Sequence, residues 1–228
     1  MRKSLTCLLC SFLFLVLCLT GCSSAPKAAK DVISPEAAVK ELQQAVTNRD
    51  WDRVSSYFDV EFFLADTYDN SAREMSVVIS QLHDRYPDDP FFWHDTEFMQ
   101  QYAIDHRDIS LLFINRILGF YFSKAAPAAN YDDNPESWLS GELAKIHSAC
   151  SAEIQDIHRS DADHAEVALS IKGDGSPYGN LADGITLKLA MEKQTDGTWK
   201  FTRITNIREL IFPVADKAEM FWTLQGWQ

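Results

Sequence analysis

The stretch Ile185-Thr186-Leu187-Lys188-Leu189-Ala190-Met191-Glu192-Lys193-Gln194-Thr195-Asp196-Gly197-Thr198-Trp199-Lys200-Phe201 decides the fold class. Its first seven residues place an apolar side chain at every second position, which is typical of a half-buried β-strand. Thr195-Asp196-Gly197 then supplies a hairpin turn, after which Trp199 and Phe201 open another strand. The stretch therefore predicts an antiparallel hairpin whose second strand runs to about Ile207.

Two further strands are expected just upstream. From Ala152 the apolar spacing changes from a helical period to a period of two. Residues 152–159 and 164–172 read as strands around a turn at 161–163, and residues 173–183 read as a long glycine-bearing loop. Together the four strands predict an antiparallel meander.

The chain before this meander has helical spacing. Ser34-Pro35-Glu36 is a helix start, because Ser34 can cap the first turn, proline fits the first helical position and Glu36 complements the helix dipole. The expected helices cover 35 to about 48, a short segment after the cap Asp50, 71–86, 96–105, 109–122 and 137–147, with a loop over 125–136. Helices followed by a meander predict an α+β fold, with N-terminal helices packed on a C-terminal antiparallel sheet of about four strands.

The first residues carry the pattern of an export signal. A basic start, Met1-Arg2-Lys3, precedes an apolar run over residues 5–19 that is too short to span a bilayer. Leu19-Thr20-Gly21-Cys22 follows at once and resembles the lipobox of bacterial lipoproteins. The resemblance implies that residues 1–21 are a cleaved signal peptide, that Cys22 is the lipidation site, and that lipid on Cys22 is what binds the protein to a membrane.

This interpretation assigns the rest of the chain and its place in the cell. Residues 22–33 would be a lipidated tether, and residues 34–228 a single α+β domain with a helical middle at about 61–147. The location implied is the bacterial cell envelope, anchored to a membrane; Ser23 after the lipidated cysteine is compatible with the outer membrane of a two-membrane bacterium.

Removal of the signal peptide would change the number of cysteines and the net charge. Five cysteines become the anchor Cys22 and one thiol, Cys150, so no disulfide within the mature chain is expected. Removing Arg2 and Lys3 leaves 19 basic against 33 acidic residues, which makes the net charge −14 instead of −12. Such a body is repelled by anionic lipid, and it lacks the basic face that a nucleic-acid partner needs.

Two segments resemble a known superfamily. The run from Pro35 to Asp59, with Asn48-Arg49-Asp50-Trp51, and the closing run from Ile185 to Ile207, with Asp196-Gly197-Thr198-Trp199-Lys200, resemble nuclear transport factor 2-like, or cystatin-like, domains. The resemblance implies a cone-like sheet wrapped around helices. Members that bind small molecules or act as isomerases keep acids inside the cone. The middle at 61–147 is longer than in such domains.

One candidate site follows from pairing the first two strands. A turn centred on Asp161 and Ala162 places Asp156 opposite Val167 and Ile154 opposite Leu169, which turns the Asp156 carboxylate to the apolar face. Burial there would raise the pKa of Asp156 and suit it to proton transfer. A register slip of one residue would move this candidate catalytic residue to solvent.

Metal and cofactor chemistry have weak support in the sequence. His94 and Glu97 lie three residues apart without the two-histidine spacing of a zinc site. The loop over 174–179 has a tyrosine where a calcium ligand belongs. No phosphate-binding glycine loop and no nucleophile elbow is present, and we expect no metal and no cofactor.

Three functions remain open at this point. The first is a non-enzymatic binding domain for a small apolar ligand or a protein partner. The second is an isomerase-like enzyme of the same superfamily that uses a pocket carboxylate or a histidine, and the third is a structural envelope lipoprotein. The aromatic tail over 217–228 is expected to dock on the domain or to offer a patch to a partner.

Overall fold

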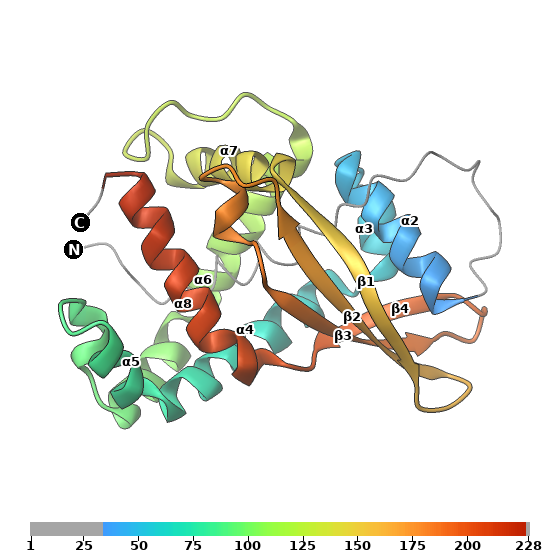
Figure 1. Ribbon diagram of the computed structural model, residues 1–228, viewed down its shortest axis with the longest axis horizontal. Coiled ribbons are helices and arrows are strands. Elements are labelled where there is room, and N and C mark those ends of the chain that lie inside the picture. The colour runs from blue at the N-terminus through green and yellow to red at the C-terminus, as the bar shows by residue number, and fades with distance from the viewer. Residues whose placement is uncertain (1–33, 227–228) are drawn as a thin grey trace.

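Four antiparallel strands form a meander in the order β1-β2-β3-β4, and helices pack against it (Figure 1). The computed structural model describes residues 34–226, so the predicted signal peptide, the anchor Cys22 and the tether at 22–33 lie outside the described residues. The elements are α2 (Pro35–Thr47), α3 (Trp51–Tyr57), α4 (Val60–Val77), α5 (Ile79–Arg85), η1 (Pro90–Trp93), α6 (Thr96–Ser123), α7 (Pro135–Ser148), β1 (Cys150–Arg159), β2 (His164–Gly173), η2 (Gly179–Leu181), β3 (Thr186–Lys193), β4 (Trp199–Ile204) and α8 (Ile207–Leu224). The α+β prediction is confirmed.

One face of the sheet is buried, as the alternation predicts. Val167 and Leu169 on β2 and Leu187 and Leu189 on β3 are all fully buried. The helices α2, α3 and α4 approach this face at β4. The ring of Phe58, between α3 and α4, stacks on Phe201 of β4 with centroids 5.2 Å apart. Helices and sheet therefore share one hydrophobic core.

The first two helices begin where their capping residues predict. Ser34 Oγ accepts a hydrogen bond from Ala37 N at 3.2 Å, and Asp50 Oδ1 accepts one from Arg53 N at 3.1 Å. Each side chain satisfies a backbone donor that has no partner within its helix. The turn between the two helices places Arg49 at φ 49°, in the left-handed region.

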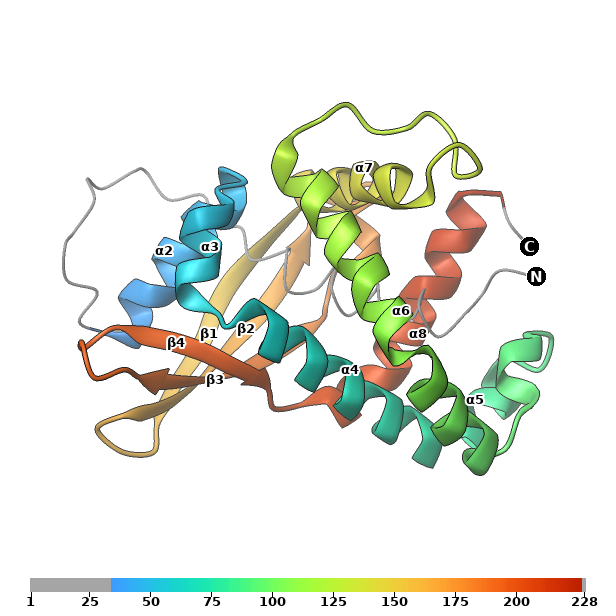
Figure 2. The same cartoon turned by 180° about the vertical axis from the view of Figure 1, so that it is seen from behind.

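The middle helices are longer than predicted. Helix α4 begins at Val60, capped by Asp59, and runs 18 residues before α5 completes the segment expected at 71–86. The helices expected at 96–105 and 109–122 are one helix, α6, of 28 residues. The polar run at 105–108 does not break it, because it contains no glycine or proline and Arg107 is ion-paired with Asp69 of α4. Figure 2 shows α6 and α4 as neighbouring rods across the back of the molecule.

The chain after the sheet also differs from the prediction. Strand β4 ends at Ile204 instead of Ile207, and Asn206 then donates to Thr186 O and accepts from Lys188 N. These hydrogen bonds hold Asn206 against β3, and the chain enters α8 at the next residue. The sequence patterns did not predict this helix. Helix α8 packs beside α4.

The expected register of the first hairpin is correct on one side of a bulge and wrong on the other. Ile154 pairs with Leu169 as predicted, but Asp156 pairs with Ala168 and Ile157 takes the place opposite Val167. One extra residue, Gln155, is accommodated between the two pairs. The bulge turns Asp156 to solvent, where it is exposed.

Candidate functional site

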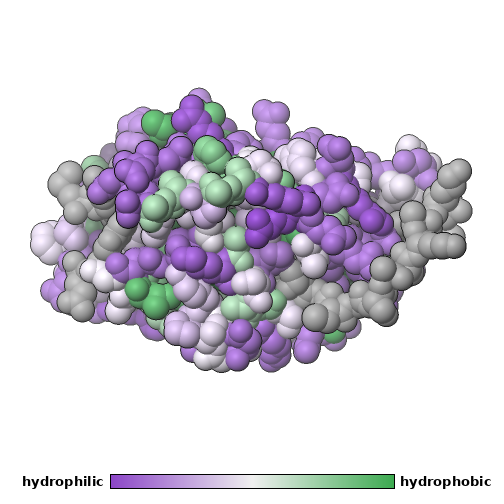
Figure 3. Space-filling view, turned by 90° about the horizontal axis from the view of Figure 1, so that it is seen from above, coloured by the Kyte–Doolittle hydropathy of each residue, from purple (hydrophilic) through white to green (hydrophobic). Residues whose placement is uncertain are grey.

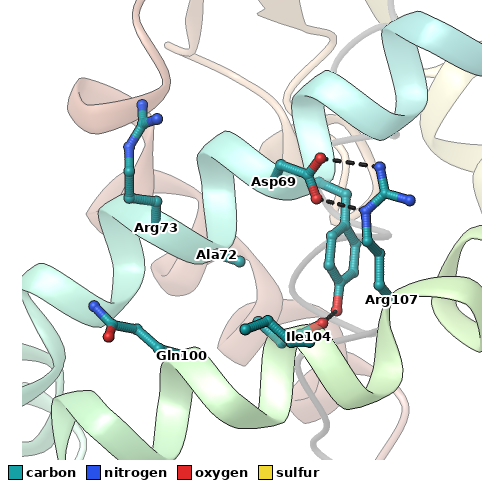
Figure 4. A pocket seen from close by; sticks show the side chains of 8 residues that line it. Asp69, Ala72, Arg73, Gln100, Ile104 and Arg107 are labelled. Atoms are coloured by element: carbon teal, nitrogen blue, oxygen red, sulfur yellow. Dashed lines mark hydrogen bonds and ion pairs between the residues drawn. The ribbon is translucent and has the colours of Figure 1, made fainter.

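An open groove of about 360 Å³ lies between α4 and α6 (Figure 4). Hydrogen bonds hold the two helices antiparallel: Tyr68 Oη donates to Ala103 O at 2.9 Å, and Thr96 Oγ1 donates to Ser76 O at 3.1 Å. The groove is lined by Tyr68, Asp69, Ala72, Arg73, Gln100, Ala103, Ile104 and Arg107.

The groove is apolar in its middle and polar at both ends. Ala72 and Ile104 lie on opposite sides of the middle of the groove (Figure 4), and Tyr68 also contributes to the lining. At one end Arg107 holds Asp69 through two parallel bonds, Nε to Oδ1 at 2.7 Å and Nη2 to Oδ2 at 2.9 Å. These bonds raise the pKa of Arg107 above its ordinary value, so the pair stays charged. At the other end Arg73 donates to Asn70 Oδ1 at 2.7 Å.

The polar groups that line the groove are mostly paired with other protein groups. Among its eight lining side chains the one carboxylate, Asp69, is ion-paired, and there is no histidine, cysteine or serine. Burial raises the pKa of Tyr68, whose hydroxyl is engaged with a backbone carbonyl. The lining therefore offers an apolar contact and two guanidinium groups.

A stripe of exposed apolar and acidic side chains runs along α6 beside the groove. We call it the acidic apolar stripe, and it consists of Ile104, Asp105, Asp108, Ile109 and Leu112. Residues spaced by four share one helix face, so these five form one band. The exposed fractions are 68% for Ile104, 65% for Ile109 and 52% for Leu112. The side chain of Asp108 is 99% exposed.

Most of the large exposed apolar side chains that the structure describes lie on α4, η1 and α6. The described residues include ten large apolar side chains that are exposed, and seven of them lie on α4, η1 and α6. On α4, Phe62 and Val77 share a helix face with Asp69 and Arg73, which line the groove. By contrast, the face in Figure 3 is mostly hydrophilic, with apolar residues only in small separate groups.

A second polar cluster is buried between α6 and α7. Tyr121 Oη and His147 Nδ1 lie 2.6 Å apart, and the guanidinium of Arg49 sits 4.6 Å above the Tyr121 ring. His147 Nε2 is buried without a hydrogen-bond partner among the described residues. Burial, with a contribution from the charge of Arg49, lowers the pKa of His147 to about 4. The imidazole is therefore neutral at ordinary pH.

The structure does not assemble the site expected around Asp156. Its carboxylate is exposed beyond the bulge, so the expectation that it faces the apolar interior is wrong. The burial on which the argument for a pocket base at this position depends is absent.

The residues considered for metal binding have other surroundings. The ring of His94 stacks on Phe98 with centroids 3.8 Å apart. Asp174 Oδ1, in the loop compared with a calcium site, accepts a hydrogen bond from Ser176 N at 2.9 Å. Within residues 34–226 no three His, Cys, Asp or Glu side chains are grouped as a metal site would require. Cys150 is a free cysteine within the described residues, and it is buried with Sγ 3.5 Å from Gly179 O.

Neither the groove nor the acidic apolar stripe was predicted from the sequence. The polar run 105–108 was expected to divide the helix, which separated Ile104 from Ile109 and Leu112. An unbroken helix would have placed Ile104, Asp108 and Leu112 on one face at intervals of four. That spacing was the available signal.

Comparisons of this chain with known proteins found no relative. The chain matches no family model, no curated protein and no solved structure. None of the helices in residues 34–226 is both long and apolar enough to cross a membrane.

Proposed function

We propose that the protein is a lipid-anchored lipoprotein of the bacterial envelope whose domain binds a protein partner through the outer surface of α4 and α6, without catalysis. One observation carries the proposal: seven of the ten exposed large apolar side chains that the structure describes lie on α4, η1 and α6. Exposed apolar clusters mark interaction sites, because their contact with water is unfavourable.

A protein partner suits this surface better than an enclosed small molecule. A small-ligand site encloses most of its ligand, whereas this groove is open, and at about 360 Å³ it is near the lower end of the usual range. Ile104 extends the apolar contact from the groove onto the exposed side of α6. An open apolar surface of this kind fits a partner chain that brings its own apolar side chains.

The proposed membrane anchor rests on the signal-peptide pattern of residues 1–21 and on Cys22. Lipid chains on Cys22 would hold the domain at a membrane, because each buried methylene contributes about 0.8 kcal/mol. The mature net charge of −14 keeps the body from lying on anionic lipid. The α4–α6 surface is then available to a partner in the same compartment.

Site-specific crosslinking tests the binding surface. A photoreactive residue replaces Ile104 or Leu112 in living cells, and Met220 on α8 serves as the control because it is 43% exposed but lies on another helix. We expect one discrete adduct from both α6 positions and none from position 220. Mass spectrometry of the adduct identifies the partner, and the purified partner must then bind the purified protein. The absence of an adduct at both α6 positions would contradict the proposal.

Mass spectrometry of the native amino terminus tests the anchor. We expect the mature chain to begin at Cys22 with acyl groups attached. Cys22→Ala should release the domain from the membrane fraction and leave its folding unchanged. An unmodified Cys22 in a membrane-bound protein would show that another mechanism holds it there.

A further inference from the structure

We infer that the partner contacts the α4–α6 surface with a basic amphipathic helix. This inference rests on the proposed function and adds the chemistry of the bound segment. Its basis is the joint presence of exposed apolar groups and unbalanced negative charge on one helix face.

The charge of the two helices is negative. Together α4 and α6 contain seven acids and three arginines, a net charge of −4. The acids are Glu61, Asp66, Asp69, Glu74, Glu97, Asp105 and Asp108, and the bases are Arg73, Arg107 and Arg116. Asp69 is neutralised by its bidentate pair with Arg107.

The acids of the acidic apolar stripe face solvent. Asp108 approaches Arg107 only at 3.8 Å, and its side chain is 99% exposed. Asp105 is also exposed and accepts a hydrogen bond from the neutral amide of Gln101. Both carboxylates alternate with Ile104 and Ile109 along the band. A partner that covers the apolar groups must therefore approach two carboxylates, and lysine or arginine side chains are the complementary groups.

Helical geometry fits the spacing of the band. The apolar groups Ile104, Ile109 and Leu112 lie within nine residues, and the eight steps from 104 to 112 rise about 12 Å at 1.5 Å per residue. An amphipathic helix presents apolar groups at intervals of three and four, with its basic groups on the flanks. Such a helix can lie along the acidic apolar stripe, with its apolar groups against Ile104, Ile109 and Leu112 and its basic groups beside Asp105 and Asp108.

The charge argues against two other occupants. A second copy of this chain would bring Asp105 and Asp108 of one stripe close to the same carboxylates of the other. An anionic bilayer would repel the same surface. A basic helical segment satisfies both the apolar and the acidic groups.

A matched pair of synthetic peptides tests the inference. Two helical peptides of about 18 residues, five turns, share one leucine pattern. One carries lysines on its polar face and the other carries glutamates. Binding of each labelled peptide to the full mature protein in nanodiscs of zwitterionic lipid is measured by fluorescence anisotropy, with empty nanodiscs as background. We expect the lysine peptide to bind, with affinity that falls as salt rises, and the glutamate peptide not to bind.

Matched variants locate the binding. Ile104→Glu should lower the affinity for the lysine peptide by about tenfold, although it adds negative charge. Met220→Glu adds the same charge on α8 and should not lower this affinity. Asp108→Lys should weaken binding by several fold more than Asp156→Lys, the same change at an exposed position on β1. Circular dichroism and thermal unfolding verify that each variant is folded.

The outcomes separate this inference from the proposed function. If both peptides bound equally and Ile104→Glu weakened the binding of both, the inference that the partner helix is basic would be overturned. The proposed binding surface would remain supported. Equal effects of Ile104→Glu and Met220→Glu would overturn the location. A crosslinked partner whose contacting segment is acidic, or a dimer that Ile104→Glu dissociates, would overturn the inference while crosslinking still supported the surface. The absence of any adduct from positions 104 and 112 would instead remove the proposed function.

Discussion

Tyr121 Oη and His147 Nδ1 lie 2.6 Å apart in the buried seam between α6 and α7. The pair joins the longest helix to the helix that leads into the sheet. It also places a titratable ring in the core beside the cation of Arg49, which has consequences for acid stability.

Protonation of the buried His147 imidazole should lower the stability of the protein in acid. Its pKa is about 4 in the folded protein and about 6.5 in the unfolded chain, so the unfolded chain binds the proton first. The contribution to stability is complete above pH 6.5 and is lost as the pH falls toward 4, by roughly 3 kcal/mol for a difference of about 2.5 pH units. His147→Gln should unfold more easily at neutral pH but show a smaller loss on acidification. Urea unfolding of both proteins at pH 7.5 and pH 4.5 measures this, and parallel losses would contradict the assignment.

The buried carboxylate of Glu142 should contribute strongly to the stability of the protein. Only 3% exposed, it accepts hydrogen bonds from Lys145 Nζ at 2.6 Å, Tyr178 Oη at 2.7 Å and Gln225 Nε2 at 2.9 Å. Glu142→Leu leaves these donors without their acceptor and should lower the free energy of unfolding by about 2 kcal/mol. Asp156→Asn, an exposed carboxylate on β1, is the control and should change it by less than about 0.5 kcal/mol. Similar values for the two variants would show that Glu142 does not join α7 to α8.

Two glycines predict opposite effects of the same substitution. A Cβ at Gly179 would lie 2.5 Å from Asp174 Oδ1 and 2.9 Å from Ala149 O, so Gly179→Ala should destabilise the protein by about 1–3 kcal/mol. A Cβ at Gly119, inside α6, meets nothing within 4 Å, so Gly119→Ala should stabilise it by about 0.5–1 kcal/mol. Thermal unfolding of both variants measures the difference in sign. Stabilisation by Gly179→Ala would show that the loop adjusts without cost.

The ion pair at the end of the groove predicts a modest coupling. Asp69 and Arg107 are partly exposed, so a double-mutant cycle with Asp69→Asn and Arg107→Gln should give about 0.5–1 kcal/mol at low salt. The coupling should fall as salt rises, because solvent ions screen exposed charges. A coupling that does not change with salt would indicate that the pair acts through packing instead of charge.

Local signals predicted the elements whose ends are fixed by a single side chain. The caps Ser34 and Asp50 and the turn at 195–197 each act within three or four residues, so they can be recognised in the sequence. The alternation in β3 was equally clear, because one face of that strand is buried against the helices. The predicted α+β class depended on these signals.

Tertiary contacts decided the rest of the fold. The polar run at 105–108 stays helical because Arg107 is ion-paired with Asp69, 38 residues earlier in the chain. The bulge at Gln155, which determines where Asp156 points, has no signature in strand periodicity. Helix α8 does show helical spacing from Ile207 onward, but Pro213 lies inside it and argues against a helix by the usual rule.

The candidate site was the least predictable part because it depends on two helices that meet only in three dimensions. Its lining comes from residues 68–73 and 100–107, and no single segment contains the pattern. The titratable group that the sequence favoured, Asp156, is on the other side of a bulge. What the sequence did indicate is the kind of function, a binding domain for an apolar ligand or a protein partner, and this remains our proposal.

The continuity of α6 has a mechanical consequence. A single helix of 28 residues is about 42 Å long, and no proline interrupts it. Its first turn is capped by Asp95, and its far end is bonded through Tyr121 to the helix that enters the sheet. A load applied at the middle of α6 would therefore reach the sheet along a stiff helix without a hinge.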